Sequence, residues 1–257
     1  GYGELCMSKV IAFAGKGGVG KTTVASLVIK KLVESGKKPV LAVDGDPNSN
    51  LGETLGLKVD STIGDIRENY MKNPQGIPAG MDKVNYLELL VEQALIETRD
   101  FDLLVMGRQE GQGCYCMVNN ILNNFTDRLA ASYDYMVVDN EAGMEHLSRR
   151  TSGKVDMLFL VTDYSLRGLR ALRRIHEMLD SLQLSVQDLG IVVTRCPESL
   201  GDTFVKEAEE VGVPIVGQIA DDPLLLEFDM ERRSLLELPE DSSALSGVVA
   251  AMDKCML

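Results

Sequence analysis

The sequence predicts an α/β fold in which about seven mostly parallel strands form one doubly wound sheet. Short apolar runs typical of buried strands alternate with segments of helical apolar spacing, and a glycine-rich loop joins the first strand to the first helix. No internal repeat, low-complexity tract or linker interrupts this alternation. We therefore expect a single domain over residues 7–257, and we interpret residues 1–6 as an expression remnant or a frayed extension.

The glycine-rich loop lies between an apolar strand at 10–14 and a helix at 24–32, and it has the pattern G-x-x-x-x-G-K-T. Its glycines let the backbone turn tightly and direct N–H groups inward, and the helix N-terminus attracts an anion. Lys21 is expected to reach the β- and γ-phosphates of a nucleotide, and the Thr22 hydroxyl to ligate Mg²⁺. The sequence thus predicts a P-loop NTPase that binds ATP or GTP through Gly17, Gly18, Val19, Gly20, Lys21, Thr22 and Thr23.

Acidic residues follow two of the predicted strands, at the sheet edge where parallel α/β proteins place their chemistry. After the second strand, we expect Asp44 to hold Mg²⁺ through water and Asp46 to orient the attacking water. Asp139, after a later strand, is expected to act as the Walker B carboxylate, and Gly143 to offer a backbone amide to the γ-phosphate. Simple turn chemistry is the alternative for Asp44 and Asp46, but their position behind a P-loop favours the catalytic interpretation.

The remaining elements follow from the same periodicities. Residues 86–98 are predicted as a helix, with a strand at 84–91 as the alternative, and residues 51–78 carry no clear pattern. Arginines on the helix predicted at 166–182 form a basic face that we interpret as solvated charge. Further apolar patterns predict strands at 40–43, 102–106, 135–138, 155–161, 189–194 and 212–219, and helices at 118–125 and 242–256.

The loops after the last two predicted strands are expected to hold the nucleotide base. One loop carries Thr194 and Arg195, and the other carries Asp221 and Pro223. In the fold that the sequence predicts, loops at these positions typically hold the base, outside the carboxyl ends of the strands.

Five cysteines, an odd number, argue against a disulfide framework. Only Cys114 and Cys116 cluster, and they lie just before a helical segment, where a helix N-terminus favours the thiolate that binds metal. Two thiolates supply half of the ligands of a four-coordinate site, and a two-fold axis between protomers would supply the rest. The alternative for the pair is a role as small half-buried apolar residues, which we favour for the single Cys196 and Cys255.

The composition argues against two classes of partner. A net charge of −13 and a pI near 4.7 disfavour nucleic acid, which requires a basic binding surface. No apolar run reaches the length of a membrane span, and the predicted C-terminal helix lacks the basic face of a membrane-surface helix. We therefore expect a cytoplasmic protein that binds neither membrane nor nucleic acid.

A second lysine, Lys16, directly follows the first glycine of the loop. With it, the string KGGVGKTT resembles the deviant Walker A motif of the MinD/ParA and nitrogenase iron protein class of P-loop ATPases. The D-x-D-P string at 44–47 resembles the first switch of that class. The resemblance implies a homodimer that depends on nucleotide, in which Lys16 reaches the phosphates of the partner subunit. The class often has Asn where this chain has Thr194, which departs from the pattern at the base.

Two further strings make the resemblance more specific within this class of ATPases: GCYC at 113–116 and DNEAGMEHLSRRT at 139–151. Together with the loop, they make the chain from about Met7 to its C-terminus resemble CooC-type accessory ATPases. That resemblance implies hydrolysis of ATP to ADP and a Ni²⁺ or Zn²⁺ ion held by Cys114 and Cys116 of both protomers. It also implies that apo carbon monoxide dehydrogenase receives the nickel. A paralogue that serves acetyl-CoA synthase shares the same motifs.

Two alternatives come from other functional classes. An electron-transfer ATPase like the nitrogenase iron protein would hold a [4Fe–4S] cluster between protomers with four thiolates. That family, however, takes its two cysteines from separate loops, whereas both come from one loop here. A MinD/ParA-like positioning ATPase would bind membrane or DNA, and the acidic charge of this chain counts against it.

Overall fold

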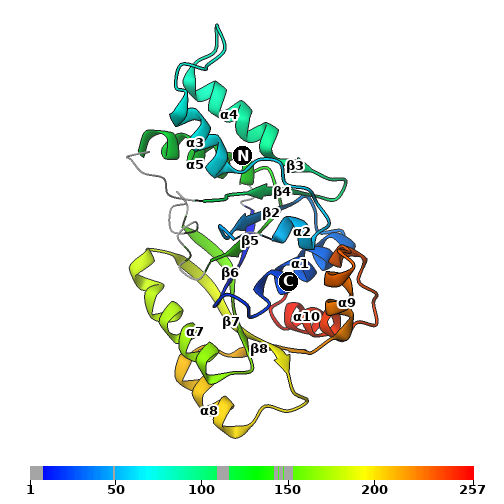
Figure 1. Cartoon of the computed structure of the whole chain (residues 1–257). Helices are drawn as coiled ribbons and strands as arrows, with labels where there is room; N and C mark the ends of the chain where they lie inside the picture. The colour runs from blue at the N-terminus through cyan, green and yellow to red at the C-terminus, as the bar shows by residue number, and fades with distance from the viewer. Residues whose placement is uncertain (1–7, 49, 109–115, 142–143, 145–146, 148–152) are drawn as a thin grey trace, which may run out of the picture.

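The computed structural model describes residues 8–48, 50–108, 116–141, 144, 147 and 153–257. Within these residues the chain forms an eight-stranded sheet with the order β3-β4-β2-β5-β1-β6-β7-β8 (Figure 1). Every pairing is parallel except that of β3 with β4, so the predicted mostly parallel α/β fold is confirmed. The strands are β1 (Lys9–Ala14), β2 (Val40–Gly45), β3 (Ile96–Glu97), β4 (Phe101–Val105), β5 (Tyr135–Asn140), β6 (Lys154–Asp163), β7 (Ser185–Cys196) and β8 (Ile215–Ala220).

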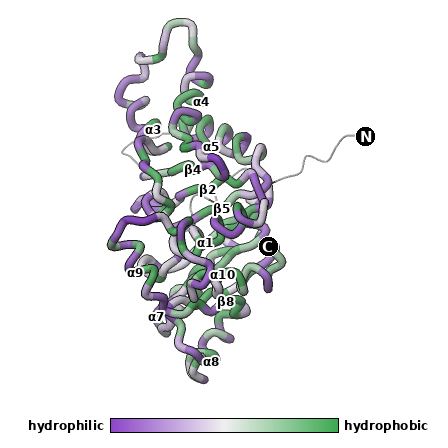
Figure 2. Tube along the Cα trace, turned by 90° about the vertical axis from the view of Figure 1, so that its right-hand side faces the viewer, coloured by the Kyte–Doolittle hydropathy of each residue, from purple (hydrophilic) through white to green (hydrophobic). Residues whose placement is uncertain are grey.

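The sheet is buried on both faces, as its continuous apolar strands require. Along β1, Val10 and Ala12 pack into one hydrophobic cluster, whereas Ile11 and Phe13 pack into the other. This alternation follows from the two-residue repeat of a strand. The ring of Phe13 stacks on Phe159 of β6 with centroids 5.3 Å apart. Hydrophobic colour runs along the central strands in Figure 2.

Helices cover both faces of the sheet (Figure 1). One face packs against α1 (Lys21–Glu34), α2 (Leu51–Thr54), α9 (Pro223–Met230), the 3₁₀ turn η2 (Leu235–Glu237) and α10 (Ser243–Lys254). The opposite face packs against α3 (Ile63–Lys72), α4 (Lys83–Ala94), α5 (Cys116–Ala130), α7 (Leu166–Met178) and α8 (Asp202–Val211). The sheet is therefore the middle layer of three, and the strand ends at its edge remain available for a site.

The helices resolve the ambiguous parts of the sequence. The helix predicted at 86–98 is right in type, and the strand alternative at 84–91 is wrong, because α4 covers residues 83–94. Asp82 caps this helix by accepting from the Asn85 amide. Residues 96–97 instead form β3. The segment without a clear pattern contains α2 and α3. The helix predicted at 166–182 ends at Met178 and is followed by the 3₁₀ turn η1 (Asp180–Leu182).

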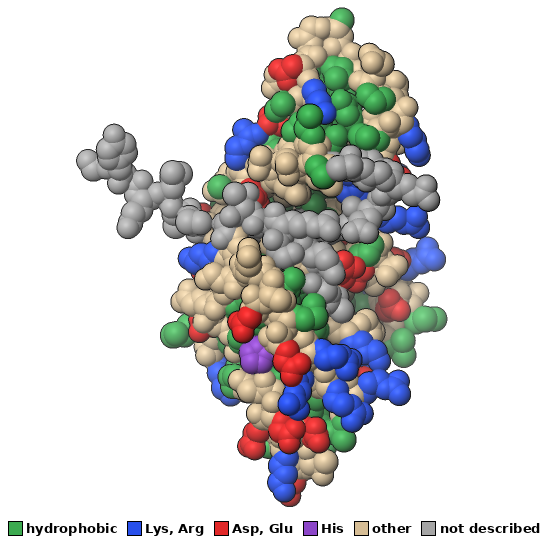
Figure 3. Space-filling model, turned by 90° about the vertical axis from the view of Figure 1, so that its left-hand side faces the viewer, with side chains coloured by type: hydrophobic (Ala, Val, Ile, Leu, Met, Phe, Trp, Pro, Cys, Tyr) green, Lys and Arg blue, Asp and Glu red, His purple; other side chains and the backbone are tan. Residues whose placement is uncertain are grey.

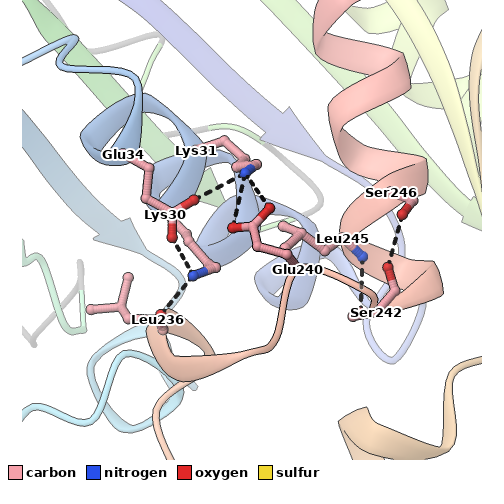
Figure 4. A network of polar contacts seen from close by, with 8 residues as sticks. All are labelled: Lys30, Lys31, Glu34, Leu236, Glu240, Ser242, Leu245 and Ser246. Atoms are coloured by element: carbon pink, nitrogen blue, oxygen red, sulfur yellow. Dashed lines mark hydrogen bonds and ion pairs between the residues drawn. The ribbon is translucent and has the colours of Figure 1, made fainter.

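The P-loop helix α1 is joined to the C-terminal part of the chain by a polar network (Figure 4). Buried Lys30 donates to the Leu236 carbonyl at 2.8 Å and also bonds Glu34. The neighbouring Lys31 pairs with Glu240 at 3.0 Å. Because both lysines come from α1, the helix that begins at the P-loop is held at its other end by the segment that precedes α10.

The surface agrees with the sequence expectations for charge. Lys and Arg side chains gather over α7 in Figure 3, where the exposed arginines are Arg167, Arg170, Arg173 and Arg174. Arg173 pairs with Glu177 at 3.3 Å, as expected for a solvated face. Among the described residues, no helix has the length and apolar character needed to cross a membrane.

Candidate functional site

The glycine-rich loop connects the end of β1 at Ala14 to the start of α1 at Lys21. A Cβ atom on Gly15 would lie 2.3 Å from the Val161 carbonyl oxygen, so only glycine fits against β6 there. Gly18 and Gly20 have φ angles of +84° and +86°, a region that glycine adopts without strain. The sequence therefore folds this loop tightly against the ends of two central strands, as a phosphate-binding loop requires.

Lys21 lies buried among the strand ends, with 6% of its surface exposed. Its Nζ atom is 3.2 Å from Asp139 Oδ1 and 3.7 Å from Asp46 Oδ2, and it donates to the Asn140 carbonyl. The sequence analysis placed Lys21, Asp46 and Asp139 in one site, and the structure brings all three together. The ammonium group of Lys21 can donate a further hydrogen bond to a phosphate oxygen that enters this site.

Asp139 is 1% exposed, at the end of β5, and its Oδ2 accepts a 2.6 Å hydrogen bond from the Thr22 hydroxyl. Burial raises the pKa of the Asp139 carboxyl, and the positive charge of Lys21 and the Thr22 hydroxyl oppose that rise. Hydroxyl and carboxylate oxygens are ligands that Mg²⁺ prefers in proteins. The donor set at this point therefore fits a magnesium ion.

Asp44 and Asp46 differ in their surroundings. Asp44 is fully buried, and its two carboxylate oxygens accept from the Asp46 and Leu51 amides at 3.2 and 3.1 Å. Asp46 is partly exposed, and its Oδ1 accepts from the Asn48 amide at 2.9 Å. Asp44 thus fixes the course of the segment between β2 and α2, and Asp46 is the carboxylate that faces Lys21. The turn chemistry considered for this segment is present together with the ion pair to Lys21.

A cavity of about 360 Å³ lies beside the loop, between α1, the ends of β7 and β8, and α9. The Thr194 hydroxyl donates to the Val19 carbonyl at 2.6 Å, and the Arg195 guanidinium donates to the Gly18 carbonyl at 3.1 Å. The cavity is lined by Val19, Gly20, Thr23, Val24, Leu27, Thr194, Arg195, Ile219, Ala220, Asp221, Asp222, Leu225, Leu226 and Asp229. Three of the four residues predicted for the base line it, and Pro223 instead begins α9.

Asp222 has a structural role that the sequence analysis did not assign. Its Oδ1 accepts from the Leu224 amide at 3.0 Å, which caps α9. Its Oδ2 accepts from the Ser242 hydroxyl at 2.6 Å and the Ala244 amide at 3.0 Å, which holds the start of α10. Burial alone would raise the pKa of Asp222, but these hydrogen bonds outweigh it, so the pKa is lowered. An Asp before a Pro is the signal that identifies such a cap.

Two charged residues near the loop, one acidic and one basic, were also not predicted as site residues. Asp229 of α9 lines the cavity beside the loop, and it shares a smaller cavity of about 180 Å³ with Arg232, Glu53 and the loop residues Thr22 and Thr23. No local motif marks Asp229 or Arg232, because their place depends on how α9 packs against α1.

Cys116 is the first residue of α5, and its side chain is exposed. Cys114 and Gly143, which were predicted for the metal and the γ-phosphate, lie outside the described residues. Cys196 is buried and Cys255 is half-buried, in agreement with their interpretation as small apolar residues, and burial raises the pKa of both thiols. Within the described part of the chain, no group of three His, Cys, Asp or Glu residues is placed to hold a metal ion.

The expected extra lysine, Lys16, lies exposed on the outside of the loop. Among the described residues it makes no hydrogen bond or ion pair, in contrast to Lys21. The two lysines of the loop therefore point to different surroundings, one inside the site and one in solvent.

Comparison with known proteins agrees with this geometry. The model of a family described as the CobQ/CobB/MinD/ParA nucleotide binding domain matches residues 10–235. An uncharacterized ATP-binding protein of Methanocaldococcus jannaschii is 42% identical over 247 residues, which cover 95% of this chain and 97% of that protein. The carbon monoxide dehydrogenase accessory protein CooC of Rhodospirillum rubrum is 26% identical over 234 residues, covering 79% of this chain and 88% of that protein.

Solved structures share the fold. The MinC:MinD cell division protein complex of Aquifex aeolicus aligns with a TM-score of 0.68 at 21% identity, over 97% of this chain and 96% of that chain. The septum site-determining protein MinD of Pyrococcus horikoshii, complexed with Mg-ADP, aligns with a TM-score of 0.67 at 22% identity, over 96% of both chains.

Proposed function

The chain belongs to the family of CobQ/CobB/MinD/ParA nucleotide-binding domains and is an ATPase of the MinD/ParA type, and we propose that it acts as a metallochaperone. In this proposal a homodimer hydrolyses ATP to ADP and phosphate while it assists the insertion of nickel into carbon monoxide dehydrogenase or acetyl-CoA synthase. The observation that carries the proposal is the place of Cys116, which begins α5 after the strand β4 at the nucleotide-binding edge of the sheet.

The phosphates of ATP bind the backbone amides of residues 17–20 and the Lys21 ammonium group. Lys21 already lies between Asp46 and Asp139, so the incoming phosphate needs no rearrangement of a distant side chain. Thr22 and Asp139 would hold Mg²⁺, and Asp44 would contribute through water. When bound, the ion neutralises charge on the β- and γ-phosphates. The base occupies the cavity lined by Thr194, Arg195 and Asp221.

Asp46 orients the water that attacks the γ-phosphate. It is the carboxylate near Lys21 that is partly exposed, whereas Asp44 and Asp139 are buried. Lys16 completes the site of the partner subunit, because its exposed side chain has no partner within the described residues of its own chain. Each subunit therefore hydrolyses ATP efficiently only when a second copy faces it.

Nickel or zinc is the cargo of the dimer, and the thiolates of Cys114 and Cys116 from both protomers bind it. The strands β1, β2 and β4 are parallel and end at one edge, so the chain that follows β4 starts at the same edge of the sheet as the P-loop. Closing two copies across this edge brings the two cysteine pairs together as it completes the two nucleotide sites. ATP binding and metal binding then favour the same closed state.

The nickel-delivery part of the proposal draws on one relative. The protein from Rhodospirillum rubrum is named a carbon monoxide dehydrogenase accessory protein, and it is 26% identical to this chain over 234 residues. Its name and the C-x-C motif of this chain together support a nickel enzyme as the client.

Metal content and dimer size test the proposal together. We expect light scattering to find a dimer in the presence of ATP and Ni²⁺, with about one nickel ion per two chains. The double variant Cys114→Ser with Cys116→Ser should lose the nickel, whereas the control Cys255→Ser should keep it. Stoichiometric nickel in the double variant would refute the metal site.

The alternatives give different signals in the same preparation. An iron–sulfur cluster between protomers would make the anaerobically purified protein brown, and the metallochaperone should be colourless before nickel is added. A positioning ATPase would sediment with anionic liposomes or bind DNA, which we do not expect for a chain of net charge −13.

A further inference from the structure

Arg67 of α3 is buried, with 5% of its surface exposed, and its guanidinium group bonds both flanks of the cysteine-bearing segment. On one flank it donates to the carbonyl of Arg108, which follows β4. On the other flank its second terminal nitrogen donates to Asn119 Oδ1, in the first turn of α5, at 3.4 Å. A planar guanidinium is suited to two acceptors at once, because its donors are held in a fixed fork.

The first turn of α3 is packed against the chain just before this segment. The Gly64 amide donates to the Met106 carbonyl at 2.9 Å, and a Cβ atom on Gly64 would lie 2.5 Å from the Arg108 carbonyl oxygen. Gly107, with φ +66°, leaves no room for a Cβ beside the Thr62 hydroxyl, which would be 2.4 Å away. The contact between α3 and the end of β4 is therefore made backbone to backbone and fixes where Arg67 stands.

The chain directly after β4 is also hydrogen-bonded to the nucleotide site. The Met106 amide donates to the Asp44 carbonyl at 2.8 Å, and the Asp44 side chain accepts from the Asp46 amide at 3.2 Å. Asp46 in turn pairs with Lys21 of the P-loop. A continuous set of hydrogen bonds and an ion pair thus leads from the P-loop to the chain that Arg67 holds.

We propose that Arg67 is a positioning residue for the metal site, which fixes the start of α5, and with it Cys116, relative to the end of β4. Burying a guanidinium group costs desolvation free energy unless its donors are bonded. An apolar side chain would fill the same space without that cost, so the arginine indicates a role for its hydrogen bonds. In this role Arg67 acts through Arg108 and Asn119 and is not itself a ligand of the metal. The inference rests on the proposed function, because it assigns Arg67 to the cysteine site named there.

Four variants test this role: Arg67→Met, Arg67→Lys, Asn119→Ala and, as the matched control, Arg170→Met on the exposed face of α7. The affinity for Ni²⁺ is measured by competition with a chromophoric chelator, and the thiolate-to-metal charge-transfer band is recorded with Co²⁺. We expect Arg67→Met to weaken nickel binding by about tenfold or more, as loss of an outer-shell partner does, and to leave kcat for ATP within about twofold. Arg67→Lys should restore part of the affinity, and Arg170→Met should behave as wild type.

Amide hydrogen exchange at residues 120–123, whose N–H groups donate to the carbonyls of the first turn of α5, gives a readout that needs no metal. It should accelerate by about tenfold in Arg67→Met, because the first turn of α5 loses its anchor. Wild-type nickel affinity and wild-type exchange in a folded Arg67→Met protein would overturn the proposal. If that variant does not fold, Asn119→Ala decides: we expect nickel binding weakened by about threefold, and no change would overturn it. If the wild-type protein itself binds no nickel, the proposed function fails and the exchange rates alone decide whether Arg67 positions Cys116.

Discussion

The hydroxyl of Thr22 donates a 2.6 Å hydrogen bond to the carboxylate of Asp139, although the two residues are 117 positions apart in the sequence. This bond joins the start of α1 to the end of β5, and Lys21 adds an ion pair to the same carboxylate. The two halves of the nucleotide site are therefore already assembled in a single chain. What a second chain would add is Lys16, which faces solvent here.

Replacing Asp139 with Asn should abolish most of the ATPase activity. The amide keeps the shape and an acceptor for Thr22, but it removes the negative charge that a magnesium ion requires, so we expect kcat to fall by ~100-fold or more. Steady-state phosphate release measures this. The exposed Asp180→Asn serves as the control, and an Asp139→Asn protein with full activity would remove the carboxylate from the mechanism.

Replacing Lys16 with Ala should reduce ATP hydrolysis by about 100-fold or more without altering stability. The side chain is exposed and makes no described contact within its own chain, so the folded subunit loses nothing. ATPase assays at several protein concentrations, together with light scattering in the presence of ATP, check both effects. Lys58→Ala, an exposed lysine paired only with nearby Asp60, is the control. Unchanged turnover in Lys16→Ala would disprove the assignment in trans.

Lys30 and Lys31 are neighbours on α1, and they should differ sharply in their effect on stability. Lys30→Met leaves the Leu236 carbonyl without its donor, so we expect the free energy of unfolding to fall by about 1–3 kcal/mol. Lys31→Met removes only surface ion pairs with Glu34 and Glu240, and should cost about 0–1 kcal/mol. Urea unfolding of both variants measures the difference, and equal losses would contradict the network in Figure 4.

The Asp222 carboxylate should make stability depend on pH in the acidic range. Its pKa is lowered in the folded protein, so its contribution is complete above the ordinary value of 3.8 and is lost as the pH falls through the lower, folded pKa. We therefore expect Asp222→Ala to be less stable than wild type by ~1–2 kcal/mol at pH 7, and this gap to narrow below pH 3.8. Denaturant unfolding at pH 7 and near pH 3 checks this, and a gap that is constant with pH would contradict it.

Local patterns were sufficient for the P-loop and the central strands. The glycines, Lys21 and Thr22 identify themselves by spacing, and strands buried on both faces appear as continuous apolar runs. The strand β3 was missed because two residues carry no periodicity, and its pairing with β4 depends on tertiary contact. No local pattern marks Arg67, since its burial becomes evident only when α3 packs against Arg108 and Asn119.

The assigned roles divide in the same way. Asp139 and Asp46 could be placed near Lys21 because the ends of parallel strands meet at one edge. Asp222 lies between Asp221 and Pro223, the two residues predicted for the base on that loop, and its side chain caps α9 and holds α10. A carboxylate beside proline fits both interpretations in a sequence, and only the position of Ser242, 20 residues further along, separates them.

The unequal room around the loop glycines has a practical consequence for engineering nucleotide selectivity. A Cβ atom on Gly15 would lie 2.3 Å from the Val161 carbonyl oxygen, while a Cβ atom on Gly17 would meet no atom within 4 Å, and Gly17 is not among the glycines with a positive φ. A randomised library of this loop should therefore keep Gly15 constant and vary the residue at position 17. Screening such a library for altered substrate preference would sample new side chains next to the phosphates without collapsing the scaffold.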